Sequence, residues 1–246
     1  MSTYSIELVP RDRESLQQEM QLVRKHFPAI DTINIPDLLK FSLRSWQACA
    51  QARSLFTHAI PHLRAIDFNL DQPFPLVETL RAGGIDAVLV IAGDQPQDMS
   101  RRVYRTSTIE LIRTLKNVMP ELKVYAGIDP YRDGIKTELD YVKRKRDAGA
   151  DGFFTQPFFD LRLMEIYHDL LSGLEVFWGI SPVLSERSKD YWDNLNNAIF
   201  PPDFEPTLAW NRQLAKEAMA FSRRHNASLY FMPIRVDLVA YLQGIL

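Results

Sequence analysis

Three polar residues stand at the ends of apolar stretches, where a residue that only fills a core is not expected. Glu7 interrupts "SIELV", Asp94 follows "AVLVIAG", and Gln156 ends "DGFFTQ". A carboxyl group in apolar surroundings has a raised pKa and can hold a proton near neutrality. An amide offers donors and an acceptor, which suits a heterocycle that alternates N–H and C=O groups. These residue types therefore favour acid–base chemistry on a heterocyclic ligand.

Each of these residues also has a purely structural interpretation. Glu7 could form an inward ion pair with an arginine such as Arg64. Asp94 could cap the turn that Gly93 allows, because aspartate is common in turns. Gln156 could form a hydrogen bond to a neighbouring loop, since a buried amide needs partners. The residues alone leave these alternatives open.

The positions of the histidines and lysines disfavour metal chemistry and Schiff-base chemistry. The five histidines show no H-x-H or H-E-x-x-H pairing, and His62 stands alone in an apolar run, where a hydrogen-bonded core histidine is the simpler interpretation. No strand candidate ends on a lysine that could attack a carbonyl group. The run "KRKR" at 143–146 is typical of a solvated helix face, although it precedes the sixth strand closely enough to reach a phosphate.

These side chains must be positioned by a regular alternation of strands and helices. Apolar runs predict strands at 5–9, 32–36, 60–66, 87–93, 122–128, 151–156, 175–181 and 228–234. Apolar residues at helical spacing predict helices between them, over 13–27, 108–118, 135–146 and 208–221. Eight such units in 246 residues predict an α/β fold, a single-domain (β/α)₈ TIM barrel over 1–246, with its chemistry at the strand ends.

An open doubly wound sheet is the rival fold, and the sequence lacks its usual glycine-rich first turn, G-x-G-x-x-G. The irregular segment 196–206 is expected to be a loop within the domain. In the barrel, Ile6 and Leu8 share one face of the first strand, so that Glu7 points to the interior.

Composition limits the partners. The chain is 46% hydrophobic and carries a net charge of −2, which gives no electrostatic footprint for nucleic acid or an anionic membrane. One cysteine, Cys49, cannot form an internal disulfide, and no stretch follows the pattern of a signal peptide or a membrane span. We therefore expect a cytoplasmic protein that acts on a small molecule, without a bound metal.

Five stretches, in this order, match one known family: "SIELVPR", "PHLRAID", "GDQP", "KRKRDAGADGFFTQPFFD" and "GISPV". On these residues the chain resembles the catalytic barrel of the methylenetetrahydrofolate reductase family, as a short, barrel-only member. The resemblance implies an oxidoreductase of folate one-carbon metabolism and methionine biosynthesis. It would reduce 5,10-methylenetetrahydrofolate to 5-methyltetrahydrofolate, with FAD carrying hydride from NADH or NADPH.

The resemblance also implies roles for single residues. Glu7 matches the family's catalytic glutamate, which protonates a folate nitrogen and opens the five-membered ring. Asp94 and Gln156 match residues that hold the pterin, and Phe158 belongs to the same folate-contacting turn. Positions that contact the flavin are matched by His62, Arg144 and Lys145. Arg235, which follows the last strand, is assigned to the glutamate tail of folate without a clear family counterpart.

The departures concern the flavin. Pro36 stands where the family has a threonine, Ala92 stands where it has an arginine, and "GIDPYR" at 127–132 replaces an "AYPE"-like stretch. FAD is therefore less secure an expectation than folate. The alternatives are a flavin-independent folate one-carbon enzyme and a non-catalytic folate-binding subunit of a methyltransferase complex. A homo-oligomer or a protein partner from the one-carbon pathway is compatible with each.

Overall fold

The computed structural model describes residues 2–96 and 102–246, in which eight parallel strands close into a barrel in chain order. The strands are β1 (Tyr4–Glu7), β2 (Thr32–Ile35), β3 (His58–Arg64), β4 (Ala87–Ile91), β5 (Lys123–Ile128), β6 (Gly152–Pro157), β7 (Val176–Ile180) and β8 (Ser228–Phe231). Every predicted strand is present. Pairing of β1 with β8 closes the ring, with Tyr4 opposite Leu229. The predicted TIM barrel is confirmed.

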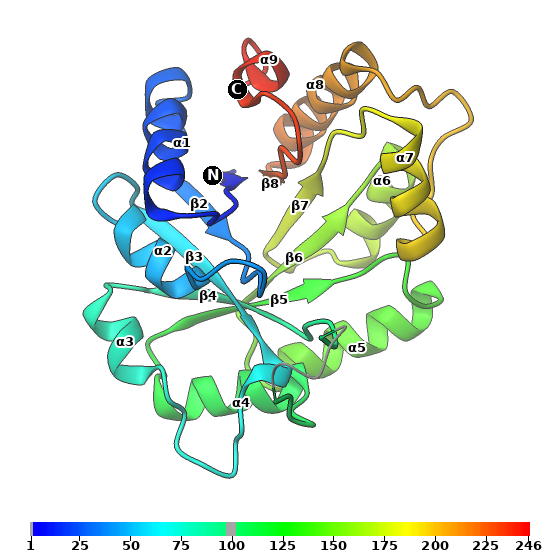
Figure 1. Ribbon diagram of the computed structural model, residues 1–246. Helices are drawn as coiled ribbons and strands as arrows, with labels where there is room; N and C mark the ends of the chain where they lie inside the picture. The colour runs from blue at the N-terminus through cyan, green and yellow to red at the C-terminus, as the bar shows by residue number, and fades with distance from the viewer. Residues whose placement is uncertain (1, 97–101) are drawn as a thin grey trace.

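Helices surround the barrel (Figure 1). They are α1 (Arg13–His26), α2 (Ser45–Ala52), α3 (Val77–Ala82), α4 (Thr108–Val118), α5 (Ile135–Asp147), α6 (Leu161–Leu170), α7 (Glu186–Asp190), α8 (Leu208–His225) and α9 (Leu238–Leu242). A 3₁₀ turn, η1 (Ala65–Asp67), follows β3, and a π-helical turn, η2 (Tyr191–Leu195), follows α7. The segment 196–206 is a loop, as predicted.

Local sequence explains where the helices begin. The Asp12 side chain accepts a hydrogen bond from Ser15 N over 2.8 Å at the start of α1. Ser107 and Glu110 form a capping box at the start of α4. Asp160 accepts from Arg162 N over 2.9 Å and caps α6. Such caps satisfy backbone N–H groups that have no partner inside the helix.

In the described part of the chain, the two largest clusters of buried apolar side chains form two layers, and a smaller third cluster includes Phe159 and Trp192. The outer layer lies between strands and helices and includes Ile6, Leu8, Ile33 and Ile35. The inner layer fills the barrel, and its members are Ile60, Ala87, Leu89, Tyr125, Phe154, Phe177 and Tyr230. The rings of Phe154 and Phe177 stack with centroids 4.3 Å apart. Because side chains alternate along each strand, the residues between the outer-layer members of β1 and β2 must point inward.

Candidate active site at the carboxyl ends of the strands

A cavity of about 460 Å³ opens where the strands end. Its wall comes from strands, from the loops that follow them and from helices α4 and α5. It includes Glu7, Pro36, His62, Ala92, Asp94, Thr108, Asp129, Arg132, Tyr141, Lys145, Gln156 and Tyr230. Five residues assigned from the sequence therefore share one cavity: Glu7, His62, Asp94, Lys145 and Gln156. Its volume lies within the usual range of about 300–1,000 Å³ for small-molecule sites.

Glu7, the last residue of β1, points into the barrel as predicted and is only 9% exposed. Burial raises the pKa of its carboxyl group to about 7, and a hydrogen bond from Asn34 opposes that rise. The alternative interpretation, an ion pair between Glu7 and Arg64, does not describe the structure. Arg64 instead donates to the backbone oxygen of Asp94 over 2.7 Å and lies 3.7 Å from Asp67. Glu7 can therefore be both protonated and ionised near neutral pH.

Asn34 is a site residue that the sequence interpretation missed. It stands opposite Glu7 in the pairing of β1 with β2 and is fully buried. Its Nδ2 donates to Glu7 Oε2 over 3.0 Å and lies 3.1 Å from Nε2 of His62. The available signal was its alternation with Ile33 and Ile35, which puts the amide on the inner face of the strand.

His62 is held in its neutral form. Burial lowers the pKa of its imidazole to about 3, although its Nε2 lies 4.0 Å from Glu7 Oε2. A neutral imidazole beside a carboxyl group gives no ion pair. Among residues 2–96 and 102–246, no group of three or more His, Cys, Asp and Glu side chains is arranged to hold a metal.

Asp94 lies at the rim of the cavity and is exposed. Gly93 precedes it with φ of 86°, and a Cβ at this glycine would come within 2.9 Å of Arg64 Nε. The glycine therefore lets the chain turn tightly over Arg64, whose bond to the Asp94 backbone fixes the turn. This leaves the carboxylate at the mouth of the cavity.

Gln156 lines the cavity, whereas Phe158 is buried in the core and does not line it. The pairing of β6 with β7 shifts register between Phe154 and Pro157, and Gln156 in this irregular stretch lines the cavity. Phe158 is completely buried and contacts the rings of Tyr131, Tyr167 and Trp178. It is not part of the cavity wall, so the expected contact between Phe158 and a substrate is not supported by its position.

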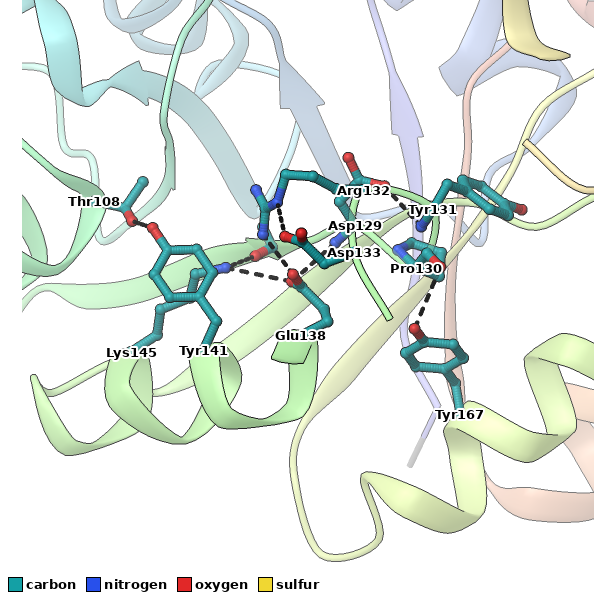
Figure 2. Close-up of polar contacts among 11 residues, drawn as sticks. Thr108, Asp129, Pro130, Tyr131, Arg132, Asp133, Glu138, Tyr141, Lys145 and Tyr167 are labelled. Atoms are coloured by element: carbon teal, nitrogen blue, oxygen red, sulfur yellow. Dashed lines mark hydrogen bonds and ion pairs between the residues drawn. The ribbon is translucent and has the colours of Figure 1, made fainter. Parts of the chain in front are cut away.

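A charge cluster around the buried Glu138 joins α5 to the preceding loop beside the cavity (Figure 2). The Glu138 carboxylate is fully buried, forms an ion pair with Arg132, and lies 3.7 Å from Lys145 Nζ. Lys145 Nζ donates to the Gly127 backbone oxygen over 2.5 Å and lies 3.8 Å from the centre of the Tyr141 ring. Burial lowers the pKa of Lys145 to about 8. The Tyr141 hydroxyl is in turn hydrogen-bonded to Thr108.

Arg235 lines a separate groove of about 290 Å³, together with Arg11, Glu19 and Asp237. Glu7 also lines this groove, so it lies between the groove and the main cavity. The Arg235 side chain is exposed, and its φ of 54° is in the left-handed region. A ligand that reaches Glu7 from the main cavity could extend into this groove toward Arg235.

Fold and site together define a (β/α)₈-barrel protein with a protonatable carboxyl group in a cavity of ligand size. A family model described as methylenetetrahydrofolate reductase matches residues 37–221. The chain therefore belongs to the methylenetetrahydrofolate reductase family.

Curated relatives agree with the family. The 5,10-methylenetetrahydrofolate reductase of Escherichia coli (strain K12) is 26% identical over 161 residues, which cover 63% of this chain and 52% of that protein. The enzyme of the same name from Pectobacterium carotovorum is 26% identical over 148 residues, covering 58% of this chain and 50% of the relative. The chain spans about half the length of these relatives.

Solved structures share the fold. A Clostridium thermocellum protein of uncharacterized function, which binds two copies of 5-methyl-5,6,7,8-tetrahydrofolic acid, aligns with a TM-score of 0.65 and 13% identity, covering 99% of this chain and 93% of that one. A 2,3-dimethylmalate lyase aligns with a TM-score of 0.57 and 11% identity, covering 95% and 75%. At these identities the likeness shows the barrel alone.

The residues present do not fit a flavin held through the three expected contacts. Lys145 is 2% exposed, and its ammonium group already contacts Gly127, Glu138 and the Tyr141 ring. Arg144 is exposed, its guanidinium lies 5.0 Å from the centre of the Tyr141 ring, and it is not in the cavity wall. Pro36, which lines the cavity, has no N–H to donate. Of the three, His62 and Lys145 line the cavity, but the Lys145 ammonium already has its partners, so only His62 is left to contact a flavin.

Proposed function

We propose that this chain reduces 5,10-methylenetetrahydrofolate to 5-methyltetrahydrofolate, with a reduced nicotinamide as the hydride donor and Glu7 as the proton donor. The observation that carries this proposal is the buried Glu7 carboxyl group, whose pKa is raised to about 7 inside the cavity. A general acid is most effective when its pKa lies near the working pH. A folate nitrogen that receives this proton becomes a leaving group.

The proposed reaction balances with these two donors. The O–H bond of Glu7 breaks, the proton goes to the folate nitrogen, and the C–N bond of the five-membered ring opens to an iminium. The nicotinamide then gives hydride to the methylene carbon, which becomes a methyl group, and leaves as the oxidised cofactor. Hydride transfer is the cofactor's own chemistry, so the protein needs no nucleophile.

Other cavity residues would bind the pterin ring through hydrogen bonds. Asp94 and Gln156 line the same cavity as Glu7 and present acceptors and an amide donor, which match the edge of a pterin. The exposed Arg235 in the adjoining groove would bind the carboxylates of the folate glutamate tail. That a barrel of the same fold binds 5-methyltetrahydrofolic acid supports a folate as the ligand class.

Because the Lys145 ammonium is already paired with Gly127 and Glu138, it is not free to hold FAD. This favours direct hydride transfer from nicotinamide to folate over hydride transfer through FAD. Bound FAD would show absorbance bands in the blue in the protein as purified. The flavin-independent reaction predicts that these bands are missing and that added FAD leaves the rate unchanged.

The test is purified protein with 5,10-methylenetetrahydrofolate and NADH or NADPH, followed by loss of the nicotinamide absorbance and by identification of 5-methyltetrahydrofolate. Glu7→Gln should abolish reduction, while Glu121→Gln, at a distant exposed position, should not change it. Folate binding without reduction by the wild type would favour the non-catalytic subunit instead. No reduction and no folate binding would contradict the proposal.

No helix in the described part of the chain is long and apolar enough to cross a membrane. The cytoplasmic location, a homo-oligomer and a partner from the one-carbon pathway remain predictions from the sequence.

A further inference from the structure

Four inward side chains on β1, β2 and β3 form one hydrogen-bonded chain beside the cavity. Ser5 and Glu7 lie two residues apart on β1, so they share its inner face, and Asn34 stands opposite Glu7 on β2. The Ser5 hydroxyl donates to Asn34 Oδ1 over 2.8 Å. Asn34 Nδ2 then reaches both Glu7 Oε2 and His62 Nε2, over 3.0 and 3.1 Å.

The hydrogen-bonding capacity of each group determines which group donates in this network. Because Oδ1 of Asn34 accepts from Ser5, its Nδ2 must face Glu7 and His62, where it supplies one N–H to each. His62 Nε2 is therefore an acceptor without a proton, which agrees with the lowered pKa of the imidazole. A flipped amide would place its oxygen against the ionised carboxylate, which is repulsive.

The two carboxyl oxygens of Glu7 therefore have different hydrogen-bonding environments. Oε2 accepts the hydrogen bond from Asn34, whereas Oε1 has no hydrogen-bond partner among the residues that the structure describes. In a neutral carboxyl group the carbonyl oxygen is the better acceptor, so the N–H of Asn34 selects Oε2 as the carbonyl oxygen. The acidic hydrogen is left on Oε1.

We propose that Asn34 is the positioning residue for the proton donor: its amide, oriented by Ser5, makes Oε1 of Glu7 the oxygen that carries and delivers the proton. The delivery of this proton to a substrate rests on the proposed reductase reaction. The position of the proton on Oε1 is a property of the ligand-free protein. When Oε1 loses its proton, the same N–H group stabilises the charge on Oε2.

Among residues 2–96 and 102–246, no other group near Glu7 takes over this task. His62 from β3 is neutral, and Tyr230 from β8 is buried with its pKa raised well above its usual value by burial and by the Glu7 charge. On the groove side, Arg11 is 2.6 Å from Glu19 and is committed to that carboxylate. The exposed Arg235 and Asp237 also line the groove, without a hydrogen bond or ion pair to Glu7 among the described residues.

The test is the titration of Glu7 in ligand-free protein, followed by the infrared band of its protonated carboxyl group and assigned by loss of that band in Glu7→Gln. Asn34→Leu should raise the pKa of Glu7 by about one to two pKa units, because the ionised form loses its hydrogen bond. Ser5→Ala should raise it by less, since the amide is kept but is free to turn over.

Thr32→Val is the matched control. Thr32 is a buried polar residue on the same strand, its hydroxyl donates to Asp31, and it does not line the cavity. This variant should leave the Glu7 titration unchanged. If Asn34→Leu does not fold, which circular dichroism reports, Ser5→Ala carries the test alone.

An unchanged Glu7 titration in the folded Asn34→Leu or Ser5→Ala protein, or an equal change in Thr32→Val, would overturn the inference and leave the reductase proposal standing. Conversely, the expected titrations in a protein that reduces no folate would support the role of Asn34 and contradict the reaction. In active protein, the pH at which reduction is lost on the alkaline side should move upward with the pKa of Glu7 in Asn34→Leu.

Discussion

The ammonium group of Lys145 lies 3.7 Å from the carboxylate of Glu138 where both side chains are almost fully buried, at 3% and 0% exposure. Arg132 meets the same carboxylate from the β5–α5 loop, so that one glutamate serves two cations (Figure 2). Removing one partner of a buried pair leaves a charge without compensation, which costs far more than the pair itself contributes. The cluster is therefore sensitive to the loss of Glu138.

We expect Glu138→Gln to lower the free energy of unfolding by about 3–5 kcal/mol, measured by urea denaturation at neutral pH. The control is Glu78→Gln on α3, where the carboxylate is 88% exposed and lies 3.5 Å from Arg81. Exposed pairs contribute little, so this variant should unfold almost as the wild type does. Equal effects of the two substitutions would show that the buried cluster is not held by Glu138.

The α5 cluster also shows what the sequence could and could not predict. The run 143–146 was expected to be a solvated face, and Lys143, Arg144 and Arg146 are indeed exposed. Lys145 is buried because it shares one helix face with Glu138 and Val142, at positions i, i+4 and i+7. That spacing is present in the sequence. A buried lysine is nevertheless not predictable from it, because the burial depends on the ion pair with Glu138, which only the structure shows.

A second prediction concerns pH. The usual pKa of a glutamate is 4.5, and burial raises that of Glu7 to about 7 in the folded protein. Between these values the folded state binds more protons than the unfolded state, so the free energy of unfolding falls as pH rises through this window. Glu7→Gln carries no charge and should be more stable than the wild type above about pH 7.

The expected gain from Glu7→Gln is about 3–4 kcal/mol at alkaline pH, since each pKa unit corresponds to about 1.4 kcal/mol. It should disappear below about pH 4.5, where the wild-type carboxyl group is protonated in both states. Urea denaturation across this range measures it, with Glu121→Gln as the reference for an exposed carboxylate. A difference that does not vary with pH would mean that Glu7 is not titrating as inferred.

The direction of Glu7 was predictable for a simple reason, and its partner was not. Alternation along "SIELV" puts Glu7 opposite in direction to Ile6 and Leu8, which pack outward. Its partner depends on strand register, which pairs Glu7 with Asn34 and lets Arg64 reach Asp94 instead. Register between distant strands is a tertiary property that a local pattern does not contain.

A third prediction tests the start of α6. Asp160 is its N-cap, and its carboxylate accepts from Arg162 N. Asp160→Ala should lower the free energy of unfolding by about 1 kcal/mol, because a backbone N–H loses its partner. Asp160→Asn keeps a capping oxygen and should retain most of the stability, although the ion pair with the exposed Arg162 is lost. Equal losses in both variants would assign the effect to the ion pair.

The last prediction separates two neighbours in "TQPFFD". Phe158 packs against Tyr131, Tyr167 and Trp178, whereas Gln156 lines the cavity. Phe158→Leu should lower the free energy of unfolding by about 1–3 kcal/mol through lost packing, with little change in the dissociation constant for 5-methyltetrahydrofolate. Gln156→Leu should do the reverse and weaken folate binding about 5–30-fold, the equivalent of one or two kcal/mol.

Urea denaturation and a fluorescence titration with 5-methyltetrahydrofolate measure the two effects on the same protein preparations. Folate affinity must be compared at a temperature at which each variant is fully folded, because partial unfolding would imitate weak binding. If Phe158→Leu weakens folate binding as much as Gln156→Leu does while remaining folded, Phe158 reaches the ligand through a rearranged wall. If neither variant alters binding, the pterin is not held at the end of β6, and the assignment of Gln156 fails together with that of its neighbour.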